Sequence, residues 1–376
     1  MPKQPSECRV SWKQVAAFRL RRHYLTDDTS PGLVELCGGV CGIQAQILSA
    51  ACLSCCVRNR ALTPQAIHDA LWRRRSLVRT SAMRQTLHLL PAADFSVYIH
   101  ALKARRLSAI ERGASGFGVA PADLRGMNEM AVAALEAGPL TQRELNERLR
   151  RGARKRKKMR AWMDAFWSPL RYAVIAGLIC YGPDRGREPT CLRVDQWLPK
   201  VEEMDETVAR TILLERFLRA YAPATLHDFA HWSGLSMKEA RQTWDSRAGR
   251  LAPVSVDGHS AFVLTDDLEI LQNSVMDDPN IRLLPYFDVY LLAHAGKDHL
   301  IDPRYYKRVY RNQAWISPVV LLDGRIAGIW SFDRTGKKTV FKAELFEKLP
   351  KALRERMEKE GERLAGLQVK LLKPIG

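Results

Sequence analysis

Two glutamines separated by one alanine, Gln44 and Gln46, are the residues of this chain whose type and spacing best suit chemistry. A glutamine does not titrate, but its carbonyl oxygen accepts a hydrogen bond from water and its dipole stabilises nearby positive charge. At this spacing the two side chains point to nearly opposite sides of a regular helix but share one face of an extended segment. Because Gly42 precedes the pair, we expect an extended backbone that enters a helix over residues 47–57. The alternative is structural, with one glutamine solvated and the other capping that helix.

The composition indicates a folded protein with an anionic partner. The chain has 376 residues, 46% hydrophobic and 27% charged, which is enough for two or three domains. Its formal net charge is +18, from 59 Lys and Arg against 41 Asp and Glu. Such a charge favours a polyanion, because each neutralised phosphate releases a counterion; solubility is the alternative explanation. Since we find neither a signal peptide nor a membrane span, we expect a cytoplasmic, nucleoid-associated protein that does not contact membranes.

The eight cysteines do not predict a metal site. Five crowd together, namely Cys37, Cys41, Cys52, Cys55 and Cys56. Their four-residue spacings lie in apolar helical text, whereas structural zinc sites prefer closely spaced pairs on turns. We therefore expect small, reduced, buried side chains, no metal and no cofactor.

One order of elements recurs three times and predicts three tandem winged helix-turn-helix modules. The clearest copy lies in residues 201–275, with expected helices at 205–221, 226–232 and 237–244 and a hairpin at 251–264. Asp257-Gly258 is a strong two-residue hairpin signal. A second copy in residues 126–200 has expected helices at 128–137, 141–150 and 161–176, followed by a wing at 178–194. The first copy, residues 1–125, has helical text at 15–24, 33–57 and 63–73 and a hairpin at 77–90.

The last part of the chain, residues 276–376, changes to strand patterns. We expect strands at 281–290, 316–322, 326–332 and 339–343, then a helix at 351–365 and a short strand at 367–372. This β unit, with a barrel as one possible arrangement, would serve as a hub for the helical modules. The predicted fold class is α+β, with three tandem modules around a C-terminal β unit.

Three such modules in a basic chain predict duplex DNA binding. An ordinary repressor has one module and dimerises on a palindrome, so we expect a monomer instead. The basic run between residues 150 and 160 is either a solvated linker or a set of phosphate contacts. Its candidate DNA-binding residues are Arg154, Lys155, Arg156, Lys157 and Lys158.

Several motifs resemble those of the AlkZ-type DNA glycosylases, the azinomycin-resistance enzymes. The glutamine pair matches that family's glutamine–apolar–glutamine motif. Arg79-Thr80 and the stretch Met83-Arg84-Gln85-Thr86-Leu87-His88 resemble its R-T…M-R-x-T-L-H pattern. Residues 284–288 and 322–330 resemble its C-terminal motifs, so the likeness covers most of the chain in the right order.

The resemblance implies tandem winged helices around a basic cleft and excision of N7-alkylated purines from duplex DNA, including azinomycin-type interstrand crosslinks. Gln44 and Gln46 would be catalytic. A related branch has aspartate at the second position, so Gln46 places this chain nearer the azinomycin-type branch. Because no lysine adjoins the pair to form a Schiff base, we expect a monofunctional enzyme that leaves an intact abasic site.

The resemblance also suggests DNA contacts for Arg79, Thr80, Arg84, Thr86 and His88. His88 and Arg84 would contact a phosphate near the lesion, although His88 could instead pack inside a hairpin. In the family a β-hairpin enters the groove, and two turns are candidates here. Their basic residues are Arg325 in one, and Arg334, Lys337 and Lys338 in the other.

Asp288, in apolar text, suggests a buried partner of an arginine such as Arg282. Two rival functions remain open from the sequence. One is a non-catalytic DNA-binding regulator, and the other is a general alkylpurine glycosylase that does not act on crosslinks.

Overall fold

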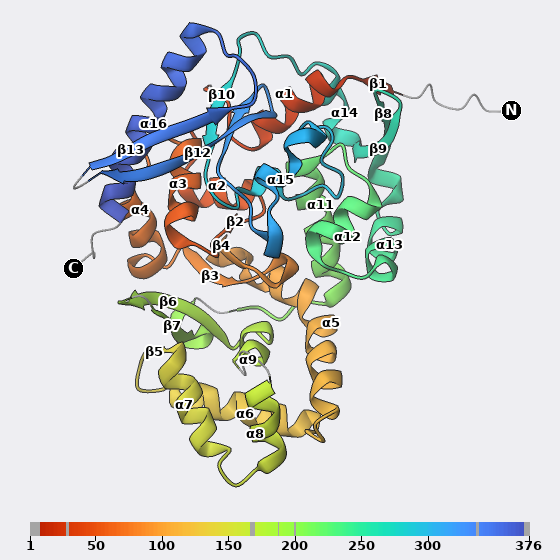
Figure 1. The fold of residues 1–376 in the computed structure, drawn as a ribbon. Coiled ribbons are helices and arrows are strands. Elements are labelled where there is room, and N and C mark those ends of the chain that lie inside the picture. The colour runs from red at the N-terminus through yellow and green to blue at the C-terminus, as the bar shows by residue number, and fades with distance from the viewer. Residues whose placement is uncertain are drawn as a thin grey trace, which may run out of the picture. The chain divides into compact units, whose positions relative to one another are not determined.

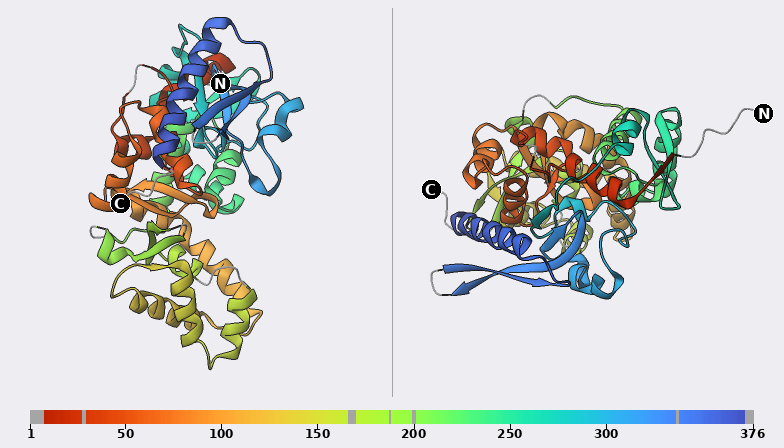
Figure 2. Two further views of the ribbon diagram at one scale, coloured as in Figure 1. Left: turned by 60° about the vertical axis from the view of Figure 1, so that its left-hand side comes forward. Right: turned by 90° about the horizontal axis from the view of Figure 1, so that it is seen from above.

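A computed structural model describes residues 8–27, 30–165, 170–186, 188–198, 201–335 and 338–371 (Figures 1 and 2). The chain forms two compact units. Unit one combines residues 1–67 with 214–376, and unit two contains residues 68–213, so the boundaries fall within α4 (Pro64–His68) and α11 (Glu206–Tyr221). Both units mix helices with mainly antiparallel strands, as expected for an α+β protein.

Unit one is built on a four-stranded antiparallel sheet in the order β10-β11-β12-β13. The strands are β10 (Ile281–Leu284), β11 (Val319–Leu322), β12 (Arg325–Thr335) and β13 (Lys338–Leu345). The terminal helix α16 (Lys351–Leu371) lies along the hairpin of β12 and β13 (Figures 1 and 2). The Phe341 ring packs closely on Gly361 of this helix, so that a Cβ on Gly361 would lie 2.3 Å from the ring. A hydrophobic core cluster of this unit joins the sheet to α3 (Leu48–Arg58) and α16.

The C-terminal predictions were right in strand order and wrong in three details. The strand expected at 281–290 ends at Leu284, because the chain turns there and continues as a 3-10 helix at Val289–Leu291. The strand expected at 367–372 is helical up to Leu371, so α16 is one continuous helix. The barrel is also wrong for the described strands, since β10 and β13 are the two edges of an open sheet.

The helical text expected at 33–57 is interrupted by a short strand, Ile43–Gln44, and the remaining helices of unit one include two that the sequence did not predict, at residues 268–272 and 306–309. These remaining helices are α1 (Trp12–Arg22), α2 (Leu33–Gly39), α12 (Leu226–Ser233), α13 (Met237–Asp245), α14 (Leu268–Gln272) and α15 (Tyr306–Val309). The capping boxes that begin α12 and α13 form at Thr225 and Ser236, and Gly234 adopts the left-handed conformation between these helices. The hairpin β8 (Leu251–Val256) and β9 (His259–Leu264) pairs as expected, and β1 (Cys8–Val10) adds a parallel strand beside β8.

Unit two places helices on a sheet whose strands run β4-β3-β6-β7-β5. The strands are β3 (Leu77–Ser81), β4 (Leu87–Pro91), β5 (Leu140–Thr141), β6 (Ile179–Arg185) and β7 (Glu188–Arg193). The helices are α5 (Phe95–Ser115), α6 (Pro121–Ala134), α7 (Gln142–Gly152), α8 (Lys157–Ala165), α9 (Arg171–Ile175) and α10 (Val194–Trp197). A π-helical turn, Asp69–Arg73, continues α4.

Two predictions for unit two need correction. The helix expected at 161–176 is represented by α8, which begins four residues earlier within the basic run, and by α9. The sequence assigned no element to α5, whose first eight residues are all buried, so that no amphipathic stripe marks them.

Candidate active site and nucleic-acid interface

The loop that precedes the glutamine pair is held in a specific turn. Cys41 donates its backbone N–H to the Gly38 carbonyl at 3.0 Å, and Gly42 donates to Cys37 at 2.6 Å. Gly42 has a φ of +91°, which disfavours any residue with a Cβ. The Tyr221 hydroxyl donates to the Val40 carbonyl at 2.9 Å and fixes the loop from α11. These contacts determine where the chain leaves α2 and begins β2 (Ile43–Gln44).

The two glutamines lie in non-helical backbone immediately before α3, as the spacing predicts. Gln44 is the last residue of β2 and is 6% exposed, whereas Gln46 is exposed. The N-cap of α3 is Ile47, whose side chain makes no capping hydrogen bond, so neither glutamine occupies the N-cap position itself. The pair therefore joins one buried amide to one exposed amide at the entrance of a helix.

The other end of α3 is fixed by a buried ion pair. Arg58 donates to both carboxylate oxygens of Asp288 at 2.7 Å, and both side chains are fully buried. Ser54, one turn earlier on α3, donates to the same carboxylate at 2.7 Å. Burial raises the pKa of Asp288, but the Arg58 charge and these hydrogen bonds outweigh that effect and hold the pKa below its usual value.

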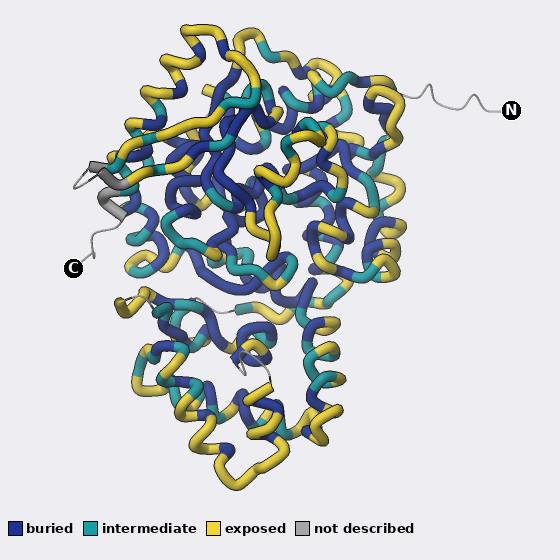
Figure 3. Tube along the Cα trace, in the orientation of Figure 1, coloured by how far each residue is buried: buried dark blue, intermediate teal, exposed yellow. Residues whose placement is uncertain are grey.

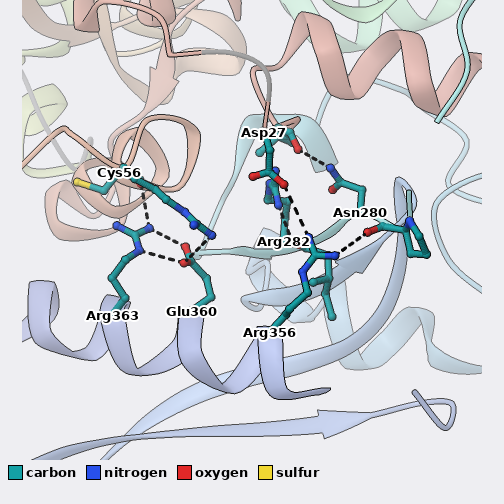
Figure 4. Close-up of polar contacts among 11 residues, drawn as sticks. Asp27, Cys56, Asn280, Arg282, Arg356, Glu360 and Arg363 are labelled. Atoms are coloured by element: carbon teal, nitrogen blue, oxygen red, sulfur yellow. Dashed lines mark hydrogen bonds and ion pairs between the residues drawn. The ribbon is translucent and has the colours of Figure 1, made fainter. Parts of the chain in front are cut away.

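Arg282, the partner that the sequence suggested for Asp288, belongs to a different cluster. It pairs with Asp27 at 2.8 Å, so that part of the prediction was wrong. Figure 4 shows this cluster, in which Arg356 also approaches Asp27 and Arg363 pairs with Glu360. Arg363 donates in addition to the carbonyl of Cys56 at 3.1 Å and so connects α16 to the last turn of α3.

The crowded cysteines pack the helices around the glutamine pair. All five are buried, four of them in α2 and α3, whereas Cys41 lies in the turn. A side-chain hydrogen bond with Cys37, together with burial, raises the pKa of Cys55, so it stays a thiol that links the two helices. In the part of the chain that the structure describes, no three His, Cys, Asp or Glu side chains gather as metal ligands would.

The turn between β3 and β4 carries the second family motif in a strained conformation. Arg84 and Gln85 have φ values of +51° and +62°, which are uncommon for residues with a Cβ. Backbone hydrogen bonds of 3.0 Å between Ala82 and Thr86 and from Thr86 to Met83 hold the turn. Arg171 also pairs with the Gln85 side chain. Arg84 and Thr86 are partly exposed, and strain of this kind is concentrated at functional positions.

Three of the predicted DNA contacts are buried and do not fit direct contact in this conformation. Thr80 is 0% and His88 1% exposed, while Arg79 is 5% exposed and pairs with Asp184 at 3.2 Å. Burial and the nearby Arg84 charge lower the pKa of His88 to about 3, so its imidazole is neutral and bonds to the Thr86 carbonyl at 3.0 Å. These side chains support the strained turn from within the sheet.

The basic run forms an exposed cationic segment between α7 and α8, here called the 154–158 segment. Arg154, Lys155, Arg156, Lys157 and Lys158 are all exposed (Figure 3). Arg156 approaches Asp123 at 3.9 Å, which is the limit of an ion pair. Because α7 extends to Gly152 and α8 begins at Lys157, only residues 153–156 form a linker.

The structure describes one of the two candidate hairpin turns in full. The Asp323-Gly324 turn packs against α1, since Tyr290 donates its hydroxyl to the Gly324 carbonyl and a Cβ on Gly324 would lie 2.9 Å from Ala16. Arg325 is exposed but donates to the His299 carbonyl at 3.2 Å. The long hairpin of β12 and β13 is paired as far as Thr335 and Lys338. Lys337 lies outside the described residues, as do the side chains of Arg334 and Lys338.

Sequence reasoning missed the residues that anchor α3. Arg58 ends an apolar helix and Asp288 follows an apolar strand, so two opposite charges in apolar text were the available signal. It did not identify which arginine pairs with Asp288, because Arg58 and Asp288 lie 230 residues apart.

No helix in the described part of the chain is long and apolar enough to cross a membrane.

Comparisons with known proteins agree with the motifs. A family model described as DNA glycosylase AlkZ-like matches residues 38–367. An interstrand DNA cross-link repair glycosylase from Streptomyces sahachiroi is 34% identical over 334 residues, which span 86% of this chain and 88% of that protein. The solved structure of the Streptomyces sahachiroi DNA glycosylase AlkZ covers 95% of this chain and 97% of its own, with 29% identity and a TM-score of 0.81. The chain therefore belongs to the AlkZ-like DNA glycosylase family.

Proposed function

We propose that this DNA glycosylase hydrolyses the N-glycosidic bond of N7-alkylated purines in duplex DNA and unhooks N7-linked interstrand crosslinks. The observation that carries the proposal is the glutamine pair at the entrance of α3, one amide buried and one exposed. A relative of 34% identity bears the name of an interstrand DNA cross-link repair glycosylase, which supports the crosslinked substrate.

Two neutral amides, which cannot act as general acids, suit this reaction. Alkylation at N7 makes the purine cationic, so the base departs as a neutral leaving group and needs no general acid. The remaining tasks are to stabilise an oxocarbenium-like sugar and to deliver water to C1′. A carbonyl dipole performs the first task, and a carbonyl oxygen that accepts from water performs the second.

The different burial of the two glutamines assigns them different tasks in this proposal. Gln44, enclosed at the end of β2, is a fixed dipole in surroundings of low polarity, where its effect on a developing positive charge is strongest. Gln46, exposed beside it, orients the attacking water. An exposed group of this kind also suits a crosslinked purine, which is tethered to the opposite strand and cannot rotate into a deep pocket.

We infer that the DNA scaffold consists of winged helix-turn-helix modules arranged as a concave basic surface. Support comes from the element order α11, α12, α13, β8, β9 in residues 201–275 and from the order α7, α8, α9, β6, β7 in residues 126–200, which α6 enters from Pro121. The remaining two divisions are residues 1–125, with the glutamine pair, and the β unit 276–376. In this proposal the protein acts on duplex DNA as a monomer, without a cofactor.

The 154–158 segment is the proposed phosphate-binding part of the second module. Two lysines, Lys157 and Lys158, begin α8, whose first turn contains no acidic residue. Cations at a helix N-terminus oppose the helix dipole, so this arrangement costs stability and favours a bound anion. The β12–β13 hairpin, with Arg334, Lys337 and Lys338, is the proposed groove-entering element. Arg84 and Thr86 are proposed contacts near the lesion.

Single-turnover excision of 7-methylguanine from a duplex tests the catalytic assignment. Gln44→Ala and Gln46→Ala should each lower the rate by about 10²–10³, the usual loss for one preorganised polar group. Gln65→Ala, on an exposed position of α4, is the matched control and should leave the rate unchanged. Thermal melting and duplex affinity should be the same in all four proteins. Wild-type rates in both alanine variants would favour the regulator instead.

The product distinguishes hydrolysis from a lyase reaction. The expected product is an intact abasic site, which alkali cleaves and which borohydride does not trap on the protein. A crosslinked duplex assayed in parallel tests the substrate range. Unhooking at a rate within about tenfold of 7-methylguanine release would support the proposed activity on crosslinks. Release of 7-methylguanine alone would indicate the general alkylpurine glycosylase.

A further inference from the structure

Unit one contains a cavity of about 570 Å³ that the proposed reaction does not use. It lies between α1, the loop after α14 and the turn between β11 and β12. Trp12, Ala16 and Arg19 line it from α1, and Tyr290 and His299 line it from the β unit. A cavity of this size fits a small molecule, because ligand pockets usually span about 300–1,000 Å³.

Arg19, one of the residues that line this cavity, is buried and forms no ion pair within the described part of the chain. Arg19 is 4% exposed and donates to the carbonyls of Ala222 at 3.3 Å and Pro223 at 2.7 Å. Among the described residues no carboxylate forms an ion pair with it, and Asp228 acts on it only from a longer distance. Burial accordingly lowers the pKa of Arg19 to about 10. The two carbonyls accept from Nε and Nη2 of Arg19 but do not compensate its charge, so an anion in the cavity would gain a buried partner.

One wall of the cavity is flat and aromatic. The Trp12 ring stacks on His299 with centroids 4.9 Å apart and an interplanar angle of 10°. The guanidinium of Arg19 lies 5.9 Å from the Trp12 ring centre. Burial, followed by the charges of Arg19 and Lys297, lowers the pKa of His299 to about 2, so this imidazole is a neutral aromatic surface. A planar ring would pack against the wall with its negative group near Arg19.

The entrance of the cavity limits the charge of the ligand. Asp277 and Asp278 are exposed there, and Asp323 is partly exposed. Lys13 and Arg325, both exposed, balance part of this charge. Carboxylates at the entrance repel a polyanion such as a triphosphate or a DNA backbone, whereas a single negative charge carried inward escapes most of that repulsion.

We propose that this cavity is a binding site for a small planar aromatic monoanion, such as an aromatic carboxylate. The carboxylate lies toward Arg19, and the ring packs along Trp12. This site is separate from the glutamine pair, and its occupation does not depend on the proposed glycosylase reaction.

Isothermal titration with 2-naphthoate and its neutral counterpart 2-naphthamide tests the site. We expect 2-naphthoate to bind with a dissociation constant between about 10 µM and 1 mM, typical of a ligand with so few atoms. The amide has the same ring without the charge and should bind at least about tenfold more weakly. Equal affinity of the two compounds, or no measurable binding of 2-naphthoate, would overturn the proposal.

Variants locate the binding. Trp12→Ala should weaken 2-naphthoate binding about tenfold, whereas Trp197→Ala, which removes a similar Arg–Trp contact in unit two, should leave it unchanged. Since Arg19→Met could unfold the protein, Ala16→Met provides a second test: it fills the cavity and preserves helix propensity. Loss of binding in an Ala16→Met protein that melts like the wild type supports the site. Wild-type affinity in both the Trp12 and Ala16 variants would show that the ligand binds elsewhere.

Discussion

Charged residues serve opposite purposes at the end of α3 and in the 154–158 segment. Arg58 and Asp288 are fully buried, paired through two hydrogen bonds of 2.7 Å and joined by Ser54. The five cations of the 154–158 segment are exposed. One of them, Arg156, lies 3.9 Å from the carboxylate of Asp123, which is the limit of an ion pair. The first group acts on the position of a helix, and the second is available to an anion in solution.

This difference shows why net charge alone does not locate a binding surface. Arginines such as Arg19, Arg58 and Arg79 count toward the charge of +18 but are buried. A buried pair gives little net stability relative to apolar residues, yet it fixes one geometry because its loss leaves an uncompensated charge. We therefore expect α3, which begins just after Gln46, to be positioned by Arg58 and Asp288.

The largest effect is expected from removing the exposed charges. Changing Lys155, Arg156, Lys157 and Lys158 to glutamine should lower duplex affinity at 50 mM salt by a factor on the order of 10⁴ if all four contact phosphates. The slope of log affinity against log salt should fall by about 3.6. Melting should shift little, because all four side chains are exposed. Titrations between 50 and 200 mM salt measure the slope.

A matched set of charges on α16 and before it controls for net charge. Lys348, Lys351, Arg354 and Lys359 are also exposed, and changing them to glutamine removes the same formal charge. If both quadruple variants lose affinity equally, only global charge matters and the 154–158 segment is a solvated linker.

The next effect concerns the buried pair. Asp288→Asn should destabilise the protein by about 3–5 kcal/mol, because Arg58 keeps its charge without a partner. The double variant Arg58→Met with Asp288→Leu should recover much of that stability by removing both charges. Denaturant melts measure stability, and excision rates at a temperature where each protein is folded measure the position of α3. A double variant that regains stability but excises slowly would support positioning; one that regains both would assign the pair to stability alone.

A smaller effect is expected in the pH dependence of stability, from His23, which lies near the same buried pair. Burial and the Arg58 charge lower the pKa of His23 to about 3, against 6.5 in the unfolded chain. The unfolded state therefore binds more protons between these values, so this contribution is complete above pH 6.5 and is lost as the pH falls toward 3. By pH 5 about 2 kcal/mol of this contribution has been lost. Melts at pH 7 and pH 5 measure this effect. Between these pH values His23→Phe should lose less stability than the wild type, while His259→Phe, on an exposed position, should lose as much as the wild type.

The sequence predicted best where local signals were sufficient. Thr225 and Ser236 cap α12 and α13 as expected, and Asp257-Gly258 turns β8 into β9, because these features depend on neighbouring residues alone. The extended backbone of the glutamine pair followed from its spacing and from Gly42.

Features that depend on distant contacts were not predictable in the same way. The residues at 367–372 alternate as a strand would, but up to Leu371 they continue α16, which packs on the sheet through Gly361 and Phe341. The motif predicted DNA contacts for Thr80 and His88, but both side chains are buried in the sheet of unit two. The partner of Asp288 required the fold itself, because several arginines were equally plausible.

The smallest effect is expected at the exposed member of the glutamine pair. Gln46→Asp keeps an oxygen that accepts from water, and the related branch of the family carries aspartate there, so release of 7-methylguanine should remain within about tenfold of wild type. The same change at the buried position, Gln44→Asp, places a carboxylate in a 6% exposed site and should cost far more in both rate and stability. Single-turnover rates and melts of the two variants separate the buried position from the exposed one. If Gln44→Asp is tolerated as well as Gln46→Asp, burial does not divide the work between the two amides.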